Sequence, residues 1–272
     1  MIETPEVSFC VSSNRPFLWK RLYDDMSRAS KSMSFEIVIV GPKEADFQLP
    51  SNLKYIKTGN IKVPQCFEIS MKQAQGRNIS FIGDDSVFDQ EDAVFLLYKE
   101  YQEYSSKNGK DIIMLPRLRR GVDQPLKYGK TNEAPLASLN CALFDRNLLK
   151  IIGGADIRFI AVYWDCDMAM RFWEAGISLF KSQDIIVREY VASDGIYLHQ
   201  KCKPYDKDIL DSFWTRRTIE GENVPSESVW CYRKDKKFVV SKKRLKEFTG
   251  YKDENIMVKS QGVCSYGELL WD

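Results

Sequence analysis

The sequence predicts an α/β fold with an open, mainly parallel sheet that carries helices on both faces. Short apolar runs rich in Val, Ile and Phe alternate along the chain with longer stretches in which apolar residues recur at helical spacing. This alternation is typical of parallel sheets, because parallel neighbours need a crossover connection. With 272 residues, the chain is long enough for one large domain, or for one domain and a small appendage.

Four strands and two helices are predicted in the first third of the chain. The strands are apolar runs bounded by polar or turn residues, at 7–13, 35–40, 53–57 and 79–82. The first helix is expected from Asn14 to about Ser30, because Pro16 is favourable in the first turn of a helix. The second helix is expected over 64–75, with Gly76 as its C-terminal stop.

The rest of the chain continues the alternation and then changes character. We expect a helix at 93–104, a strand at 111–115, a short strand and helix within 136–152, a helix at 164–176, a strand at 184–191 and an extended piece at 195–201. The basic stretch 117–130 has no periodicity and is expected to be a loop. Lysines become frequent after about Tyr205, so we divide the chain into a main domain, 1–204, and an appendage packed on it, 205–272.

The composition narrows the class of protein. With 40 basic and 38 acidic residues the net charge is +2, which gives no electrostatic reason to expect a nucleic-acid partner. The seven cysteines are scattered and form no CxxC pair, which favours reduced thiols and a cytoplasmic location. No stretch approaches about 20 apolar residues, so no transmembrane segment is expected. The N-terminus also lacks the basic and apolar regions of a signal peptide.

Two adjacent carboxylates, Asp84 and Asp85, follow the predicted strand at 79–82. Like charges at the end of a buried strand repel each other, and a divalent cation would remove the repulsion. Mg²⁺ and Mn²⁺ bind carboxylate oxygens and leave positions for phosphate oxygens, so a metal on Asp85 could hold a diphosphate. The alternative is a solvated turn in which both carboxylates face water, because Gly-Asp-Asp-Ser is favourable turn sequence.

A second acidic cluster, WDCD, begins the predicted helix at 164–176. Asp165 fits two roles that can coexist: a cap that complements the helix dipole, and a catalytic base. Asp167 is the weaker candidate for the base, because positions i and i+2 do not face each other on a helix. Arg171, on the same helix, is expected to form a buried ion pair, with a phosphate contact as the alternative.

Four stretches of the chain form an ordered pattern: VSFCVSSNRP, FEIVIV, AQGRNISFIGDDSVF and GGADIRFIAVYWDCDMAMRFWEAG. In this order and at about this spacing they resemble the family-two glycosyltransferases, inverting enzymes with the GT-A fold. The third stretch is similar to the family's segment with the metal-binding DxD motif, and the fourth to its segment with the catalytic acid. The resemblance covers roughly residues 7 to 200 and implies a Rossmann-like sheet of the GT-A type.

The resemblance also implies an activity. It is the metal-dependent, inverting transfer of a sugar from a nucleotide-diphosphate sugar, with a UDP-sugar as the expected donor, to an acceptor hydroxyl of a glycan or another molecule. Asp165 would take the proton of the hydroxyl as it attacks the anomeric carbon. The other implied site residues are Ser12, Asn14, Arg15 and Asp84 around the nucleotide and its diphosphate, and Asp85 and His199 at Mn²⁺ or Mg²⁺.

Two departures from the family pattern keep alternatives open. Gly83 stands where the family usually has the first acid of DxD, and Gly41-Pro42-Lys43-Glu44 stands where an acid commonly reads the nucleobase. Both favour a non-catalytic relative that binds a nucleotide or a glycan. A nucleotidyltransferase ranks last, because VSFCVSSNRP has no glycine-rich phosphate loop.

Several further residues have two interpretations each. His199, the only histidine, is either structural or a ligand of the metal or the diphosphate, where many GT-A enzymes place a late histidine. Trp164 could stack on a sugar ring, whereas Trp173 is expected in the core. The basic residues of the predicted loop, Arg117, Arg119 and Arg120, either grip a phosphate or are solvated.

Overall fold

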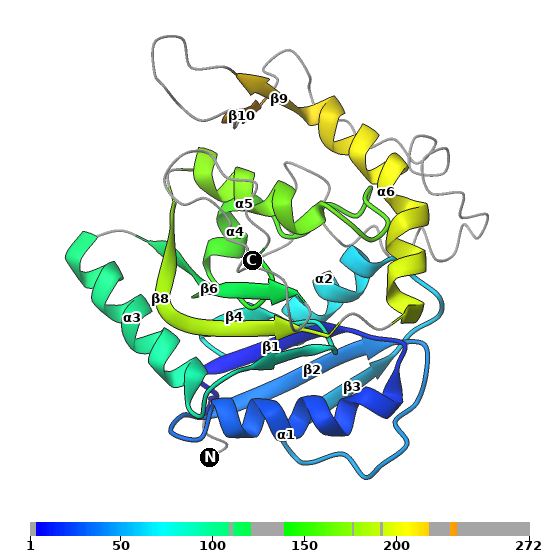
Figure 1. The fold of residues 1–272 in the computed structure, drawn as a ribbon, viewed down its shortest axis with the longest axis vertical. Helices are drawn as coiled ribbons and strands as arrows, with labels where there is room; N and C mark the ends of the chain where they lie inside the picture. Colours follow the sequence, from blue (N-terminus) through cyan, green and yellow to red (C-terminus); the bar gives the residue numbers. More distant parts are fainter. Residues whose placement is uncertain are drawn as a thin grey trace.

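The computed structural model confirms the predicted α/β fold (Figure 1). It describes residues 4–108, 111–120, 139–175, 177–190, 193–217 and 229–232. In chain order the elements are β1 Val7–Ser12, η1 Pro16–Leu18, α1 Trp19–Ala29, β2 Phe35–Gly41, β3 Leu53–Lys57, α2 Val63–Gln73, β4 Asn78–Phe81, β5 Ser86–Phe88, α3 Ala93–Asn108, β6 Ile112–Arg120, β7 Leu143–Asp145, α4 Leu148–Ile152, α5 Trp164–Glu174, β8 Ser178–Glu189, α6 Ser193–Phe213, β9 Trp214–Arg217 and β10 Val229–Tyr232.

The main sheet is mixed, with a parallel half that contains the first four strands. Its order is β3-β2-β1-β4-β7-β6-β8-β5. Strands β3, β2, β1 and β4 are parallel to one another, and β6 is parallel to β8. Strand β7 runs antiparallel to both β4 and β6, and β5 runs antiparallel to β8. The chain moves outward from β1 to β3 and then returns to β4 on the other side of β1, so the strand order reverses between β1 and β4.

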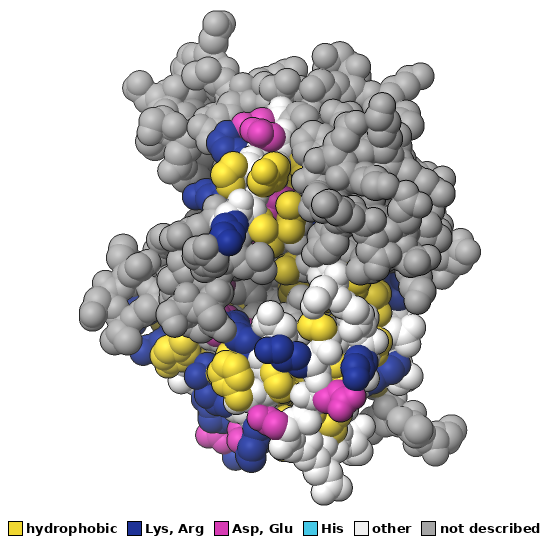
Figure 2. All heavy atoms as spheres, turned by 90° about the vertical axis from the view of Figure 1, so that its right-hand side faces the viewer, with side chains coloured by type: hydrophobic (Ala, Val, Ile, Leu, Met, Phe, Trp, Pro, Cys, Tyr) yellow, Lys and Arg dark blue, Asp and Glu magenta, His cyan; other side chains and the backbone are white. Residues whose placement is uncertain are grey.

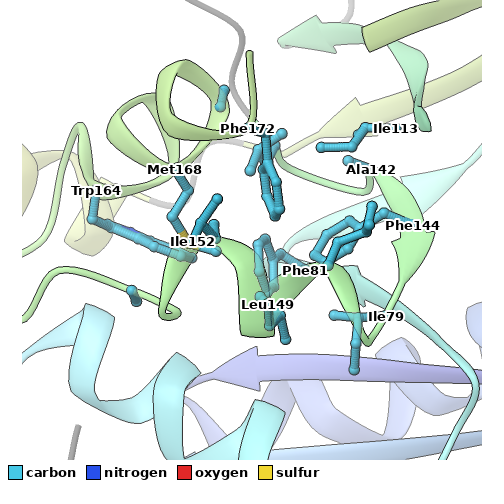
Figure 3. Close-up of a cluster of buried hydrophobic side chains, with 14 of the residues drawn as sticks. Ile79, Phe81, Ile113, Ala142, Phe144, Leu149, Ile152, Trp164, Met168 and Phe172 are labelled. Atoms are coloured by element: carbon cyan, nitrogen blue, oxygen red, sulfur yellow. The ribbon is translucent and has the colours of Figure 1, made fainter. Parts of the chain in front are cut away.

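Each face of the sheet buries its own apolar core. Helices α1 and α3 cover one face, and α2, α4, α5 and α6 cover the other (Figure 1). Strand β1 shows the alternation that a two-sided sheet requires: Phe9 and Val11 pack on the α1 side, and Cys10 packs on the α2 side. The core between the sheet and helices α2, α4, α5 and α6 contains a row of aromatic contacts that joins β4, β7 and α5 (Figure 3).

The predicted elements agree with the structure in most places. Strand β8 begins six residues before the expected strand at 184–191, strands β9 and β10 were not expected, and four further differences are the following. Residues 195–201 are helical, as part of α6, and not extended. Residues 117–120 belong to β6 and not to a loop, and β5 was not expected. The fourth difference is at Gly76, which does not cap α2, because that helix ends at Gln73 and Ala74 has an extended backbone.

Three of these differences, at α6, at β6 and at Gly76, have a physical reason. Helix α6 buries Cys202, Asp206, Ile209 and Leu210, a helical stripe whose packing overrides the strand propensity of the segment before it. Strand β6 continues past Pro116 because the register with β8 shifts between Leu115 and Arg117, where the proline lacks a ladder donor.

Gly76 is required for a close approach between two segments. Its amide donates to the Ser8 hydroxyl at 2.8 Å. A Cβ placed on Gly76 would lie 2.5 Å from that hydroxyl oxygen and 2.7 Å from the Ser8 amide nitrogen. Any side chain here would therefore push the start of β4 away from β1.

The division at residue 204 falls inside α6, which runs from Ser193 to Phe213. Of the predicted appendage, the structure describes the end of α6 and the antiparallel pair β9 and β10. The basic stretch 121–130 lies outside the described residues. None of the described helices has the length and apolar character that crossing a bilayer requires. On the face drawn in Figure 2, basic and acidic side chains are interspersed, as the near-neutral charge leads one to expect.

Candidate functional site

The candidate site lies at the carboxyl ends of β1 and β4, where the strand order reverses. Ligands of open α/β sheets gather at such a position, because the connections on its two sides diverge. The chain after β4 is held by three backbone hydrogen bonds: Ile82 N to Cys10 O, Ser86 N to Gly83 O, and Tyr190 N to the carbonyl of Asp85, each of 3.0 Å. The two carboxylates of the Gly-Asp-Asp-Ser turn are thus fixed at the rim of the sheet.

Asp84 is buried, with 3% of its surface exposed, and both of its carboxylate oxygens accept hydrogen bonds from the chain. Its Oδ2 accepts from the Ser13 hydroxyl at 2.5 Å and from Arg15 Nε at 3.0 Å. Its Oδ1 forms an ion pair with Arg15 Nη2. The Arg15 guanidinium therefore grips Asp84 through two nitrogens, the forked geometry that makes arginine a strong partner for carboxylates.

The same guanidinium also reaches the second carboxylate. Arg15 Nη2 lies 3.1 Å from Asp85 Oδ2, and the Asp85 side chain is 26% exposed. We call the side chains of Ser13, Arg15, Asp84 and Asp85 the acidic corner. Within the acidic corner, the carboxylates of Asp84 and Asp85 both contact the one guanidinium of Arg15.

A tryptophan fixes the acidic corner from the side of α1. Trp19 Nε1 donates to the Ser13 hydroxyl at 2.7 Å, and the Arg15 amide donates to the same oxygen at 3.1 Å. Because this hydroxyl also donates to Asp84, its donor and both of its acceptor positions are used. The segment that carries Arg15 is therefore anchored to the buried first residue of α1.

Burial and charge act against each other in the acidic corner. Burial raises the pKa of Asp84, and the bonds from Arg15 and Ser13 oppose that effect. Burial also acts to lower the pKa of Arg15, but Asp84 and Asp85 outweigh it, so the pKa of the guanidinium is raised. Arg15 accordingly remains charged, and the corner holds an ion pair at neutral pH.

The two carboxylates differ in their fitness to bind a metal ion. Asp84 has no open oxygen, whereas Asp85 is partly exposed and turns its Oδ1 towards Gly83. A Cβ on Gly83 would lie 2.7 Å from that Oδ1, so glycine leaves room for the Asp85 carboxylate where the family has an acid. One carboxylate is enough to carry Mg²⁺ when substrate phosphates complete its shell. Asp85 fits that role; no group of three or more His, Cys, Asp and Glu ligands occurs within the described part of the chain.

Asp165 lies in the first turn of α5, above the end of β4. The preceding residue, Trp164, stacks on Phe67 with ring centroids 4.6 Å apart and meets Phe81, the last residue of β4, at 5.3 Å (Figure 3). Helix α5 begins at Trp164, so Asp165 is in the first turn and is not the cap. The residue before the helix, Tyr163, has a left-handed backbone with φ of 64°, which is uncommon outside glycine.

The remaining acid of this cluster has a structural role. Asp167 is fully buried and accepts from Arg171 Nε at 2.8 Å. Arg171 Nη1 also donates to the Ile152 carbonyl at 2.6 Å, which ties α5 to the end of α4. The predicted buried ion pair of Arg171 is confirmed, and Asp165 is the more exposed of the two acids.

A buried polar layer that the sequence did not reveal supports the segment leading to Asp165. Asp206 of α6 is fully buried and accepts from three successive backbone amides, at residues 160, 161 and 162, over 2.7, 2.9 and 2.7 Å. Lys62, before α2, is 2% exposed and donates to the Ile157 carbonyl. A buried ion pair, Asp156 with Arg158, lies in the same segment. We call Lys62, Asp156, Arg158 and Asp206 the polar layer.

Burial also changes the acidity of two groups in the polar layer. It lowers the pKa of Lys62 to about 7, an effect that the nearby carboxylates of Asp156 and Asp206 partly oppose. It raises the pKa of Asp206, against the effect of the three amides and of Lys62. One sequence signal could have revealed Asp206: it is a single acid in the apolar stripe that Cys202, Ile209 and Leu210 form along α6.

The remaining predicted site residues are Ser12, Asn14 and His199. Ser12 ends β1, is half-buried and interacts with the Cys66 thiol of α2, whose pKa burial raises to about 11. Asn14 is exposed next to Arg15. His199 lies in a part of α6 whose side chains are outside the described set, as does the side chain of Trp173 in α5.

Comparisons with known proteins concern the fold only. No family model matches the chain, and no curated protein matches it in sequence. Crystal structures of S. aureus TarS are similar: residues 1–349 align at 14% identity with a TM-score of 0.49, covering 68% of this chain and 60% of that one. The same fragment in complex with UDP aligns at 15% identity and a TM-score of 0.49, covering 71% and 62%.

The chain thus spans about 60% of the length of that TarS fragment. At these values the similarity carries no inference about activity, which must come from this chain's own side chains. Strand order, helix placement and the acidic corner together define a mixed α/β protein with a charged site at the reversal point of its sheet.

Proposed function

We propose that this protein is a glycosyltransferase that moves a sugar from a nucleotide-diphosphate sugar to an acceptor hydroxyl with inversion. The observation that carries the proposal is the position of the acidic corner at the carboxyl ends of β1 and β4, where the strand order reverses. A charged, partly exposed site at the reversal point of a sheet is where a phosphorylated ligand is expected. The choice of a UDP-sugar rests on the sequence resemblance alone.

Asp165 is the proposed catalytic base. The acceptor oxygen attacks the anomeric carbon and forms the new bond, its proton passes to the Asp165 carboxylate, and the bond from the anomeric carbon to the diphosphate breaks. The electron pair of that bond leaves with the diphosphate, so one carboxylate is sufficient. Asp165 is half-buried in the first turn of a helix, where the helix dipole favours a negative charge.

The leaving diphosphate needs positive charge, and the proposed source is a divalent metal ion, because the Arg15 guanidinium is already paired with Asp84 and Asp85. Arg15, with Ser12 and Asn14, would border the nucleotide. A Mn²⁺ or Mg²⁺ ion would be carried by Asp85, with His199 as a further proposed ligand, and when bound it would neutralise the departing group. Asp84 serves this site as the anchor of Arg15, because both of its oxygens are bonded within the chain.

Turnover of a panel of UDP-sugars with and without Mn²⁺ tests the proposal. We expect release of UDP from at least one donor, and we expect Asp165→Asn to slow it by about 10²–10⁴-fold, because an amide cannot accept the proton. Binding of UDP, measured by titration calorimetry, should stay within about twofold. Asp24→Asn, on the exposed surface of α1, is the matched control. Wild-type turnover by Asp165→Asn would refute the assignment of the base.

A non-catalytic relative that binds a nucleotide or a glycan is the second candidate. Gly83 in place of an acid favours it, as does the guanidinium that already offsets one of the two carboxylate charges. Nucleotide binding without turnover of any donor would support this candidate over the transferase. The expected cytoplasmic location remains part of the proposal; the described cysteines, Cys10, Cys66, Cys141, Cys166 and Cys202, are all free thiols, in keeping with it.

A further inference from the structure

Arg15 occupies the position between two carboxylates where a bridging cation would be expected. Its Nη2 contacts Asp84 Oδ1 and lies 3.1 Å from Asp85 Oδ2, so one nitrogen joins both acids. Its Nε adds a bond of 3.0 Å to Asp84. The sequence alone shows two repelling charges, whereas the fold brings the neutralising charge from a segment 69 residues away.

The contact is built into the core of the fold rather than lying on its surface. The side chains of Arg15 and Asp84 are 13% and 4% exposed. Ion pairs this deep lose their hydration, and removing one partner leaves an uncompensated buried charge. Ser13 and Trp19 hold the backbone and the carboxylate in place, so the guanidinium has little freedom to leave Asp84.

The grip on Asp85 is weaker than the grip on Asp84. Asp85 receives a single contact of 3.1 Å, and its side chain is 26% exposed. Release of that contact alone would open both oxygens of Asp85 while Asp84 stays paired. The corner therefore combines a permanent ion pair with an exchangeable one.

We propose that Arg15 is the resident cation of the acidic corner and competes with divalent metal ions for Asp85. In the protein without nucleotide, the single positive charge of Arg15 already neutralises much of the pair, so Mn²⁺ binds weakly. Without the guanidinium, Asp84 and Asp85 form a bare pair of carboxylates, which binds hard divalent ions far better. This inference rests on the proposed function only in placing a metal at Asp85.

Binding of Mn²⁺ to the nucleotide-free protein tests the inference, with free Mn²⁺ followed by electron paramagnetic resonance. We expect Arg15→Gln to bind Mn²⁺ at least about tenfold more tightly than the wild type, because a charge that repels the ion at contact distance is gone. Lys20→Gln, which removes an equal charge from the exposed surface of α1, should bind as the wild type does. Mn²⁺ should also raise the melting temperature of Arg15→Gln more than that of the wild type.

Two further variants keep the test decisive if Arg15→Gln folds poorly. Arg15→Lys keeps a charge but loses the fork, and its affinity for Mn²⁺ should fall between the two others. The double variant Arg15→Gln with Asp84→Asn should lose the gain, because the second carboxylate is then absent. Equal affinities in the wild type, Arg15→Gln and Arg15→Lys would overturn the inference. No sugar donor is used, so this outcome is separate from a failure to find glycosyl transfer.

Discussion

Replacing Asp206 with alanine should destabilise the whole domain, although the residue lies in the predicted appendage. Asp206 is fully buried and accepts from three amides, at residues 160, 161 and 162, within 2.9 Å. The bond from the amide of residue 161 is buried and the other two are partly buried. A buried amide left unsatisfied costs about 1–3 kcal/mol, and a partly buried one costs less because water can reach it. We therefore expect a loss of about 3–5 kcal/mol in the free energy of unfolding, the range seen when buried charged networks are broken.

Urea denaturation followed by circular dichroism measures this loss. Asp206→Asn keeps one acceptor oxygen and should lose about half as much. Asp208→Asn is the matched control, because Asp208 lies on the same helix, α6, and its side chain is exposed. Hydrogen exchange should speed up first at residues 160–162, which lead into α5 and Asp165. A loss below about 1 kcal/mol for Asp206→Ala would refute the reasoning, since surface substitutions give effects of that size.

Two further predictions concern stability. Burial lowers the pKa of Lys62 to about 7 in the folded protein, whereas an ordinary lysine has a pKa of about 10.4. Between about pH 7 and that value, Lys62 therefore holds more proton in the unfolded chain than in the folded protein. Stability should rise there by up to about 1.4 kcal/mol per pH unit, and Lys62→Met should remove that part of the slope in urea melts. Gly76→Ala should lower the free energy of unfolding by about 2–4 kcal/mol, because the added methyl group would push β4 away from Ser8. Gly59→Ala is the control and should be nearly neutral, because the space around Gly59 is open. Equal effects of the two substitutions would contradict the close approach at Gly76.

The sheet could be predicted from the sequence because its strands carry a local signal. The runs at β1 and β2 are buried on both faces, as strands covered by helices on two sides must be, and those at β3 and β4 are short apolar runs bounded by polar residues. Their parallel pairing follows from the alternation with helices. The position of Asp84 and Asp85 at the rim then follows from their place directly after a strand.

The partner of the acid pair could not be predicted, because its signal is spatial. The family resemblance placed Arg15 and Asp84 at one site, but neither segment carries a local signal for their direct ion pair, which forms because β1 and β4 are neighbours. The sequence left a metal ion and a solvated turn as explanations for two adjacent carboxylates. The structure adds a third, an internal guanidinium, which excludes the fully solvated turn for Asp84.

Helix α6 shows a second limit of local patterns. Its first residues include Ile and Tyr, which favour strands, and the residues that decide its conformation follow one to four turns later. There the buried stripe from Cys202 to Leu210 packs on the segment before α5. Asp206 stabilises the fold through the backbone amides that it accepts from, and these belong to residues more than forty positions earlier in the chain.

The most direct test of the central claim is hydrogen exchange of the protein with and without UDP and Mn²⁺. We predict slower exchange in two separate stretches, at residues 13–19 after β1 and at residues 82–89 after β4, because the nucleotide would lie across the ends of these strands. The control variant Lys20→Gln, on the exposed surface of α1, should show the same protection. Protection confined to other parts of the sheet, or none at saturating UDP, would contradict the placement of the nucleotide site.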